Sequence, residues 1–250
     1  MVRFALFRRL CLVWPSELQS AGPHARGPRR RSAAGVDEGS PRGVLRVDSN
    51  LPKSENSMTT LLAHSLEEHL KSIQVLLDTR LDEIERAGEM ICSALREGSK
   101  VLLCGNGGSA ADAQHIAAEL VGRYEKHRRA WPAVALTTDT SALTALSNDY
   151  GYDEVFARQV EALGNEGDVL IAISTSGKSP NVIKAAEKAR ALGCKTIALT
   201  GASAEPLRSL CHLAVVVPSE RTSRVQEAHI TIGHLWCEMV DAKDRNLWTV

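Results

Sequence analysis

Apolar residues along the chain fall into two kinds of segment from Lys100 onward. Longer stretches carry apolar residues at three- and four-residue spacing, which is typical of helices that bury one face. Between them lie short, almost continuously apolar runs rich in Val, Ile, Leu and Ala, which favour strands covered on both faces. These runs are 101–103, 133–136, 169–173, 196–199 and 213–217.

The alternation of strands and helices predicts the fold class. Helices between successive strands imply parallel pairing through right-handed crossovers. We therefore expect an α/β fold with a doubly wound, flavodoxin-like, five-stranded parallel sheet flanked by helices over residues 100–241. A helical segment should precede it at 60–98, beginning with a periodic row of apolar residues: Leu61, Leu62, Leu66, Leu70, Ile73 and Leu77.

Residues 1–57 lack a sustained apolar period and are rich in Arg, Pro, Gly and Ser, so we leave them out of the predicted fold. Three interpretations compete: an Arg-rich organellar leader, a disordered tail, or an upstream stretch wrongly joined to a chain that begins at Met58. We favour the third, because the helical pattern opens directly after Met58. The predicted organisation is a non-core extension at 1–57 and one domain at 58–250.

Charge and cysteine content narrow the function classes. Residues 1–35 hold seven Arg and one acidic residue, which leaves the rest with 23 basic and 29 acidic residues, a net charge of about −6. A mildly acidic body does not favour nucleic-acid binding. The apolar start at 4–14 is too short to span a membrane. Six cysteines without a C-x-x-C pair argue against a disulfide framework, and a reducing cytoplasm fits.

The loop at 174–179 has the composition of a phosphate site. It reads Ser-Thr-Ser-Gly-Lys-Ser and joins a buried strand to a helix predicted from about Asn181 to Leu192. Four hydroxyls and the free N–H groups of a helix start favour an anion. An ordinary Ser/Thr N-cap is the alternative, but a cap needs one hydroxyl and not four.

A second loop, at 105–109, reads Gly-Asn-Gly-Gly-Ser and is neither G-x-G-x-x-G nor a Walker A sequence, which weakens nucleotide interpretations. Ser109 and Asp112 have the spacing of a capping box, and a tight structural turn is the alternative. The glycines would allow a substrate to approach the backbone, and Asn106 and Ser109 could donate hydrogen bonds to sugar hydroxyls.

Two predicted helices carry possible metal ligands. His115 and Glu119 lie four residues apart, only about 40° around a helix axis. On the last helix, Gln226 and His234 are offset by roughly 80°, so both can address one point between them. These four side chains fit a tetrahedral zinc site, although a His/Glu pair at this spacing is more often a solvated surface pair. By spacing alone, His229 is equally eligible.

Together the loops and helices resemble the sugar isomerase (SIS) domain family, and within it the bacterial phosphoheptose isomerases. The resemblance covers about residues 60–241. Its motifs are Cys104-Gly105-Asn106-Gly107-Gly108-Ser109, Asp112-Ala113-Gln114-His115, Glu119-Leu120, Asn148-Asp149, residues 174–179, and Val225-Gln226-Glu227-Ala228-His229 followed by His234. It departs from the family at Lys178, where Asn is common, and at 1–57, which have no counterpart.

This resemblance implies a cytoplasmic aldose–ketose isomerase, a homotetramer with one Zn²⁺ per subunit, that converts sedoheptulose 7-phosphate to D-glycero-D-manno-heptose 7-phosphate. It implies Glu119 as base and His234 as acid, and His229 as a structural residue. The implied metal ligands are His115, Glu119, Gln226 and His234. The expected substrate-binding residues are Asn106, Gly107, Gly108, Ser109, Glu119, Asn148, Asp149, Ser174, Thr175, Ser176, Ser179 and Gln226.

Two further classes compete with the isomerase. One is a non-catalytic domain that binds a sugar phosphate or a replication-initiation protein; relatives of that kind lack the carboxylate and imidazole present here at Glu119 and His234. The other is an aminosugar-phosphate enzyme, which needs a second SIS repeat or an amidotransferase domain. A chain of 250 residues has room for neither.

Overall fold

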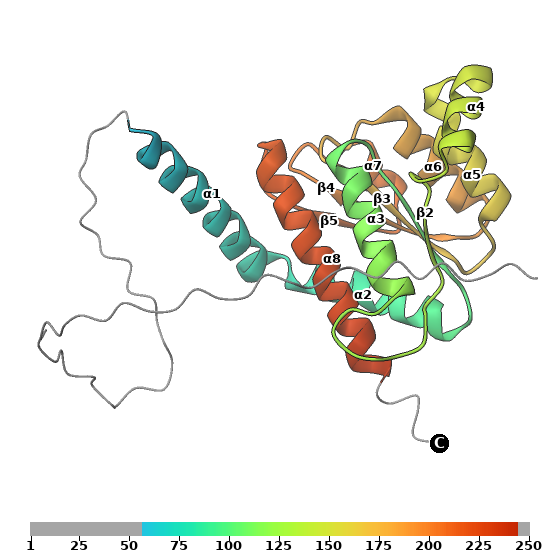
Figure 1. The fold of residues 1–250 in the computed structure, drawn as a ribbon, viewed down its shortest axis with the longest axis horizontal. Helices are drawn as coiled ribbons and strands as arrows, with labels where there is room; N and C mark the ends of the chain where they lie inside the picture. The colour runs from blue at the N-terminus through green and yellow to red at the C-terminus, as the bar shows by residue number, and fades with distance from the viewer. Residues whose placement is uncertain (1–56, 245–250) are drawn as a thin grey trace, which may run out of the picture. The chain divides into compact units, whose positions relative to one another are not determined.

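A computed structural model describes residues 57–244 of the chain. One or more helices separate each strand from the next along the described chain (Figure 1). They are α1 (Met58–Thr79), α2 (Leu81–Arg96), β1 (Val101–Cys104), α3 (Gly108–Val121), β2 (Ala133–Ala135), α4 (Thr140–Tyr150), a 3₁₀ turn (Tyr152–Glu154), α5 (Val155–Leu163), β3 (Val169–Ser174), α6 (Pro180–Ala191), β4 (Lys195–Thr200), α7 (Leu207–Leu210), β5 (Leu213–Val216) and α8 (Thr222–Asp244).

All five predicted strands form, and they pair in parallel in the order β2-β1-β3-β4-β5. Alternate residues of each strand face opposite sides, as Val101 and Leu102 illustrate by belonging to different core clusters. Helices α2, α3 and α8 cover one face of the sheet, and α5, α6 and α7 cover the other. The predicted doubly wound α/β fold is therefore confirmed.

Strand order reverses between β1 and β3, because the chain runs from β1 outward to β2 and then returns to the other side of β1. Ligands in open α/β sheets bind at such a switch point, beyond the carboxyl ends of the strands. The two loops singled out in the sequence follow β1 and β3 directly. The topology thus brings both loops to the same edge of the sheet, on neighbouring strands.

The segment expected to be helical at 60–98 consists of two helices instead of one. The break is at Arg80, whose φ of −131° and ψ of 4° leave the helical region. Its side-chain Nε donates to the carbonyl oxygen of Val216 at 3.2 Å, which ties the break to the end of β5. The extension predicted at 1–57 lies outside the described residues except for Ser57, which caps α1.

Residues 57–244 also bear on two expectations from the sequence, the lack of a membrane span and the lack of disulfide bonds. Over that range, no helix is both long enough and apolar enough to span a bilayer. The cysteines there are free thiols, and all of them except Cys211 are buried: Cys92, Cys104, Cys194 and Cys237.

Candidate functional site

The loop after β1 turns into α3 at Gly107, whose φ is 56°. That positive φ is accessible to glycine at little steric cost. Gly108 has a different reason to lack a side chain: a Cβ there would lie 2.4 Å from Nε2 of Gln226 on α8. The two glycines therefore let the start of α3 approach α8 closely.

The capping box expected from Ser109 and Asp112 is wrong. Gly107 is the N-cap of α3 and makes no side-chain cap bond, so Ser109 already lies inside the helix. The turn at Gly107 starts the helix earlier than the Ser/Asp spacing suggested.

One carboxylate oxygen of Asp112 is buried without a hydrogen-bond partner among the described residues, and burial raises the pKa of this side chain to about 6, opposed in part by His115.

Asn106 links the loop after β1 to the helix after β3. Its amide forms a reciprocal pair with Asn181, with both N–H···O distances at 2.9 Å. The hydroxyl of Tyr152 also donates to Oδ1 of Asn106, at 3.0 Å. Three segments are thereby fixed at the switch point of the sheet. Asn181 and Tyr152 were not predicted as site residues from the sequence, because only the fold brings them to Asn106.

The loop after β3 presents hydroxyls that do not cap the helix behind it. Ser179 is the N-cap of α6, yet its side chain makes no cap hydrogen bond and lies 2.9 Å from Oγ of Ser174. Oγ of Ser176 accepts from the backbone N–H of Lys178 at 3.2 Å. Gly177 provides the turn with a φ of 66°. The simple N-cap alternative for this loop loses its support.

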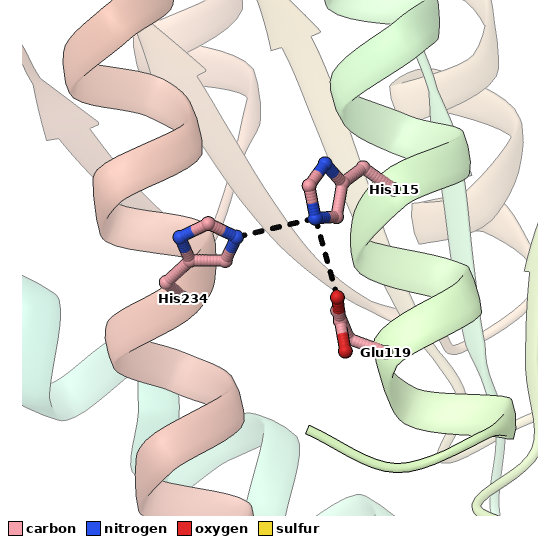
Figure 2. A group of neighbouring side chains, drawn as sticks. All are labelled: His115, Glu119 and His234. Carbon is pink, nitrogen blue, oxygen red and sulfur yellow. Dashed lines mark hydrogen bonds and ion pairs between the residues drawn. The ribbon is translucent and has the colours of Figure 1, made fainter. Parts of the chain in front are cut away.

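His115 and Glu119 on α3 meet His234 on α8 (Figure 2). Nε2 of His115 lies 3.2 Å from a carboxylate oxygen of Glu119 and 3.3 Å from Nε2 of His234. Two ring nitrogens that face each other cannot both carry a hydrogen on that line, so at least one presents a lone pair. One ligand atom from each residue falls within 4.8 Å of the others. Two imidazoles and a carboxylate are a donor set that zinc prefers, so these residues fit a zinc ion.

The remaining predicted ligand, Gln226, contacts a different part of α3. Its amide packs on Gly108, which lies about two helical turns before His115. His229 is fully buried, and neither ring nitrogen has a hydrogen-bond partner among the described residues. Burial lowers the pKa of His229 to about 4, so the ring is neutral at pH 7. His229 stands outside the cluster of His115, Glu119 and His234.

Asn148 and Asp149 lie exposed at the end of α4. Asn148 donates to Asp149 at 2.8 Å, and no hydrogen bond in the described part of the chain joins either residue to the other candidates. A neighbour that the sequence analysis missed is Tyr124, whose ring lies 5.5 Å from that of His234, centroid to centroid. The chain separation of 110 residues left no local pattern for that contact.

The fold and these two loops define a class of protein: a SIS domain matches residues 65–201. The chain is 56% identical to the phosphoheptose isomerase of Aliarcobacter butzleri over 173 residues, which cover 69% of this chain and 92% of the relative. It is 53% identical to phosphoheptose isomerase 1 of Campylobacter jejuni over 184 residues, covering 74% and 98%.

Solved structures agree with the curated relatives. A phosphoheptose isomerase from Neisseria gonorrhoeae superposes with a TM-score of 0.71 at 43% identity, covering 74% of this chain and all of that one. One from Francisella tularensis gives 0.73 at 37% identity, covering 75% and all of that chain. The chain belongs to the phosphoheptose isomerase family of SIS domain proteins.

Proposed function

We propose that this protein isomerises sedoheptulose 7-phosphate to D-glycero-D-manno-heptose 7-phosphate. The observation that carries the proposal is the meeting of Glu119 with His115 and His234 across α3 and α8. A ketose-to-aldose conversion needs one base and one acid flanking C1 and C2. The carboxylate and the imidazoles supply both kinds of group at one place, and membership of the phosphoheptose isomerase family identifies the sugar.

In the proposed reaction, Glu119 removes a proton from C1 and returns it to C2. His234 donates a proton to the C2 carbonyl oxygen and accepts the proton of the C1 hydroxyl, so the intermediate is an enediol and no proton is lost overall. Tyr124 packs against the ring of His234 and limits its orientation. Neither step needs a redox cofactor, because the substrate and product are isomers.

We assign phosphate to the loop after β3, which carries the hydroxyls of Ser174, Thr175, Ser176 and Ser179 and leads into α6. A helix N-terminus adds free N–H groups and a favourable dipole for the anion. The sugar then extends toward α3, past the Asn106–Asn181 pair. The proposed sugar contacts are Asn106, Gly107, Gly108, Ser109, Asn148, Asp149 and Gln226.

Zinc is the metal that the three-residue donor set supports best. His115, Glu119 and His234 would hold it, with Gln226 as the proposed fourth ligand and one ion per subunit. A zinc ion bound there would act as a Lewis acid that polarises the substrate carbonyl. Because His115 lies between the other two side chains, it is the residue that we assign to metal binding alone.

The protein is further assigned to the cytoplasm as a homotetramer. The free cysteines of the described residues suit a reducing compartment. Helix α1 supports assembly, because it presents large exposed apolar side chains that α2 and α8 leave uncovered. These are Met58, Leu61, Leu62, Leu66, Leu70 and Leu77, each more than half exposed.

The direct test is incubation of the zinc-loaded full chain with sedoheptulose 7-phosphate and detection of the aldoheptose 7-phosphate. We expect turnover that stops after zinc is removed with a chelator and returns when zinc is restored. Calorimetry with the same sugar phosphate separates the two function classes. Binding without conversion would favour a sensor or docking domain over the enzyme.

A further inference from the structure

Arg128 lies in the loop between α3 and β2 and connects two helices. Its guanidinium donates to the carbonyl oxygens of Glu119 and Leu120, at 2.7 and 2.9 Å. Through Nε it also donates to a carboxylate oxygen of Asp241 on α8, at 2.7 Å. Both side chains are only 2% exposed. One buried cation is therefore bonded to the end of α3 and to α8 at once.

The α3 side of this contact satisfies groups that the helix itself leaves unpaired. The last four carbonyls of an α-helix have no partner within the helix. Helix α3 ends at Val121, so the carbonyls of Glu119 and Leu120 belong to this set. Arg128 bonds both, as basic side chains near helix C-termini do. Arg128 thus bonds directly to the backbone of Glu119.

The α8 side is equally well satisfied. The second carboxylate oxygen of Asp241 accepts the backbone N–H groups of Glu125 and Lys126, each at 3.0 Å. Burial alone would raise the pKa of Asp241, but the bonds from Arg128, Lys126 and Glu125 outweigh burial and hold that pKa below its usual value. Asp241 therefore remains charged at neutral pH.

The Arg128–Asp241 contact lies near the cluster of His115, Glu119 and His234. Asp241 follows His234 by seven residues, which places it about two turns along the same face of α8. The loop that Asp241 holds also carries Tyr124, which packs on the ring of His234. A change at Arg128 or Asp241 therefore acts on the end of α3 at Glu119 and, on α8, about two turns from His234 on the same face.

We propose that the buried Arg128–Asp241 pair is a clamp that sets the separation of α3 and α8 and so positions Glu119 against His234. Arg128 and Asp241 are positioning residues, since neither belongs to the cluster itself. The inference rests on the proposed metal site and isomerase activity. It assigns to these two residues the positioning of the cluster, in addition to anchoring the loop between α3 and β2. Groups that hydrogen-bond to a metal ligand typically change metal affinity or activity 10- to 100-fold when removed, and Arg128, which Asp241 holds, bonds the main-chain carbonyl of Glu119.

A second buried carboxylate provides a matched control. Asp168 accepts two backbone N–H groups, from Lys100 and Asn165, and the side chain of Lys100, and it is 3% exposed. It thus makes the same kinds of bond as Asp241. Its place is different, because it precedes β3 at the amino edge of the sheet, opposite the loops of the candidate site. Loss of either carboxylate should destabilise the fold by a similar mechanism.

The experiment compares Asp241→Asn with Asp168→Asn in the full chain. For each we would measure Tm, the zinc dissociation constant by competition with a chromophoric chelator, and kcat and KM. Both variants should lower Tm. Only Asp241→Asn should weaken zinc binding, about 10- to 100-fold, and lower kcat at least about tenfold, with KM within about threefold because the phosphate loop follows a different strand.

Arg128→Lys covers the case in which Asp241→Asn does not fold. Lysine can keep the ion pair with Asp241, but its single ammonium cannot reproduce the fork that also reaches the carbonyls of Glu119 and Leu120. Zinc affinity and kcat should fall here too. The clamp is overturned if these variants keep wild-type zinc affinity and kcat, or if Asp168→Asn loses them equally.

The metal readout separates this inference from the proposed function. A wild-type protein that binds zinc but does not turn over sedoheptulose 7-phosphate would refute the isomerase, and zinc affinity alone would then decide on the clamp. A wild-type protein that binds no zinc would overturn both the metal site and the clamp.

Discussion

Glu119 has two proposed roles, proton transfer and metal binding. A conservative substitution can separate them. The side chain is 26% exposed and lies 3.2 Å from His115. Glu119→Gln keeps the size and the oxygen of the side chain but removes its basicity. We expect kcat to fall at least about 100-fold while the phosphate end of the substrate still binds. The measurement is steady-state kinetics on protein of determined zinc content.

His234→Gln serves as the companion variant, since it should lower kcat similarly by removing the proposed acid. Both substitutions delete a proposed metal ligand, so a variant that has lost zinc reports on the metal and not on the base. A zinc-loaded Glu119→Gln protein that works at the wild-type rate would remove Glu119 from the mechanism.

His229 predicts how stability depends on pH. Its pKa is about 4 in the folded protein, against an ordinary value of 6.5, so folding favours the neutral ring. The contribution is fully present above pH 6.5 and is lost as pH falls from 6.5 toward 4. Between pH 7.5 and 5 the free energy of unfolding should drop by about 2 kcal/mol from this residue.

Urea unfolding of wild type and His229→Leu across that pH range tests the prediction. Both proteins should be measured with a chelator present, so that protonation of metal ligands does not contribute. The variant should show a smaller drop on acidification, because leucine has no proton to gain. Parallel pH profiles for the two proteins would mean that His229 is not a source of the acid sensitivity.

At the level of elements, the sequence was most informative where a pattern is local. All five strands were predicted because each is almost continuously apolar, including the edge strands β2 and β5, which are only partly buried. Helix α6 was predicted within one residue at each end. The start of α3 was misjudged, because the positive φ of Gly107 decides it and a Ser/Asp spacing does not. The break at Arg80 depends on a bond to β5, which no helical period encodes.

The same difference between local patterns and long-range contacts applies to the candidate site. His115 and Glu119 were found together because four residues on one helix is a local relation. Their meeting with His234 needs α3 packed on α8; the spacing on the two helices allowed such a site, and the resemblance to a family favoured it. The bonds of Asn106 to Asn181 and of Arg128 to Asp241 join residues 75 and 113 positions apart. A single sequence offers no physical signal for such pairs.

The loop after β3 leads to a prediction about phosphate binding. Ser176→Ala with Ser179→Ala removes two hydroxyls proposed to donate to phosphate, and a hydrogen bond to a charged group contributes about 1.5 to 3 kcal/mol. KM should therefore rise at least about tenfold, with little change in Tm because the Ser179 side chain does not cap α6.

Ser72→Ala with Ser93→Ala is the matched control, since it removes two hydroxyls from α1 and α2, outside the site. Its KM should equal that of the wild type. If the loop variant also keeps its KM, phosphate binds elsewhere and the hydroxyls of this loop have another purpose.

For the whole molecule, the apolar side chains of α1 predict assembly. Leu66 and Leu70 lie on one face of α1 and are 65% and 66% exposed in the single chain. Burial of a leucine contributes roughly 1.5–3 kcal/mol, so Leu66→Glu with Leu70→Glu should reduce the proposed tetramer to smaller species. Light scattering after gel filtration measures the mass. Lys71→Glu adds an acid to another exposed position of α1 and should leave the mass unchanged.

The last prediction concerns which part of the chain is needed for activity. The relatives from Aliarcobacter butzleri and Campylobacter jejuni match 69% and 74% of this chain, yet 92% and 98% of their own lengths. Every residue proposed for substrate, metal or proton transfer lies between 106 and 234, and the capped start of α1 is at Ser57 and Met58. A chain that begins at Met58 should therefore keep the kcat, KM and oligomeric mass of the full chain, with Tm lowered only slightly by the loss of the Ser57 cap on α1. All four should be measured on proteins purified in parallel, because a large loss of Tm, or a loss of oligomeric mass, with normal kinetics would assign the first 57 residues to stability or assembly. A loss of kcat at full zinc content would instead place part of the active site in that segment, against the present assignment.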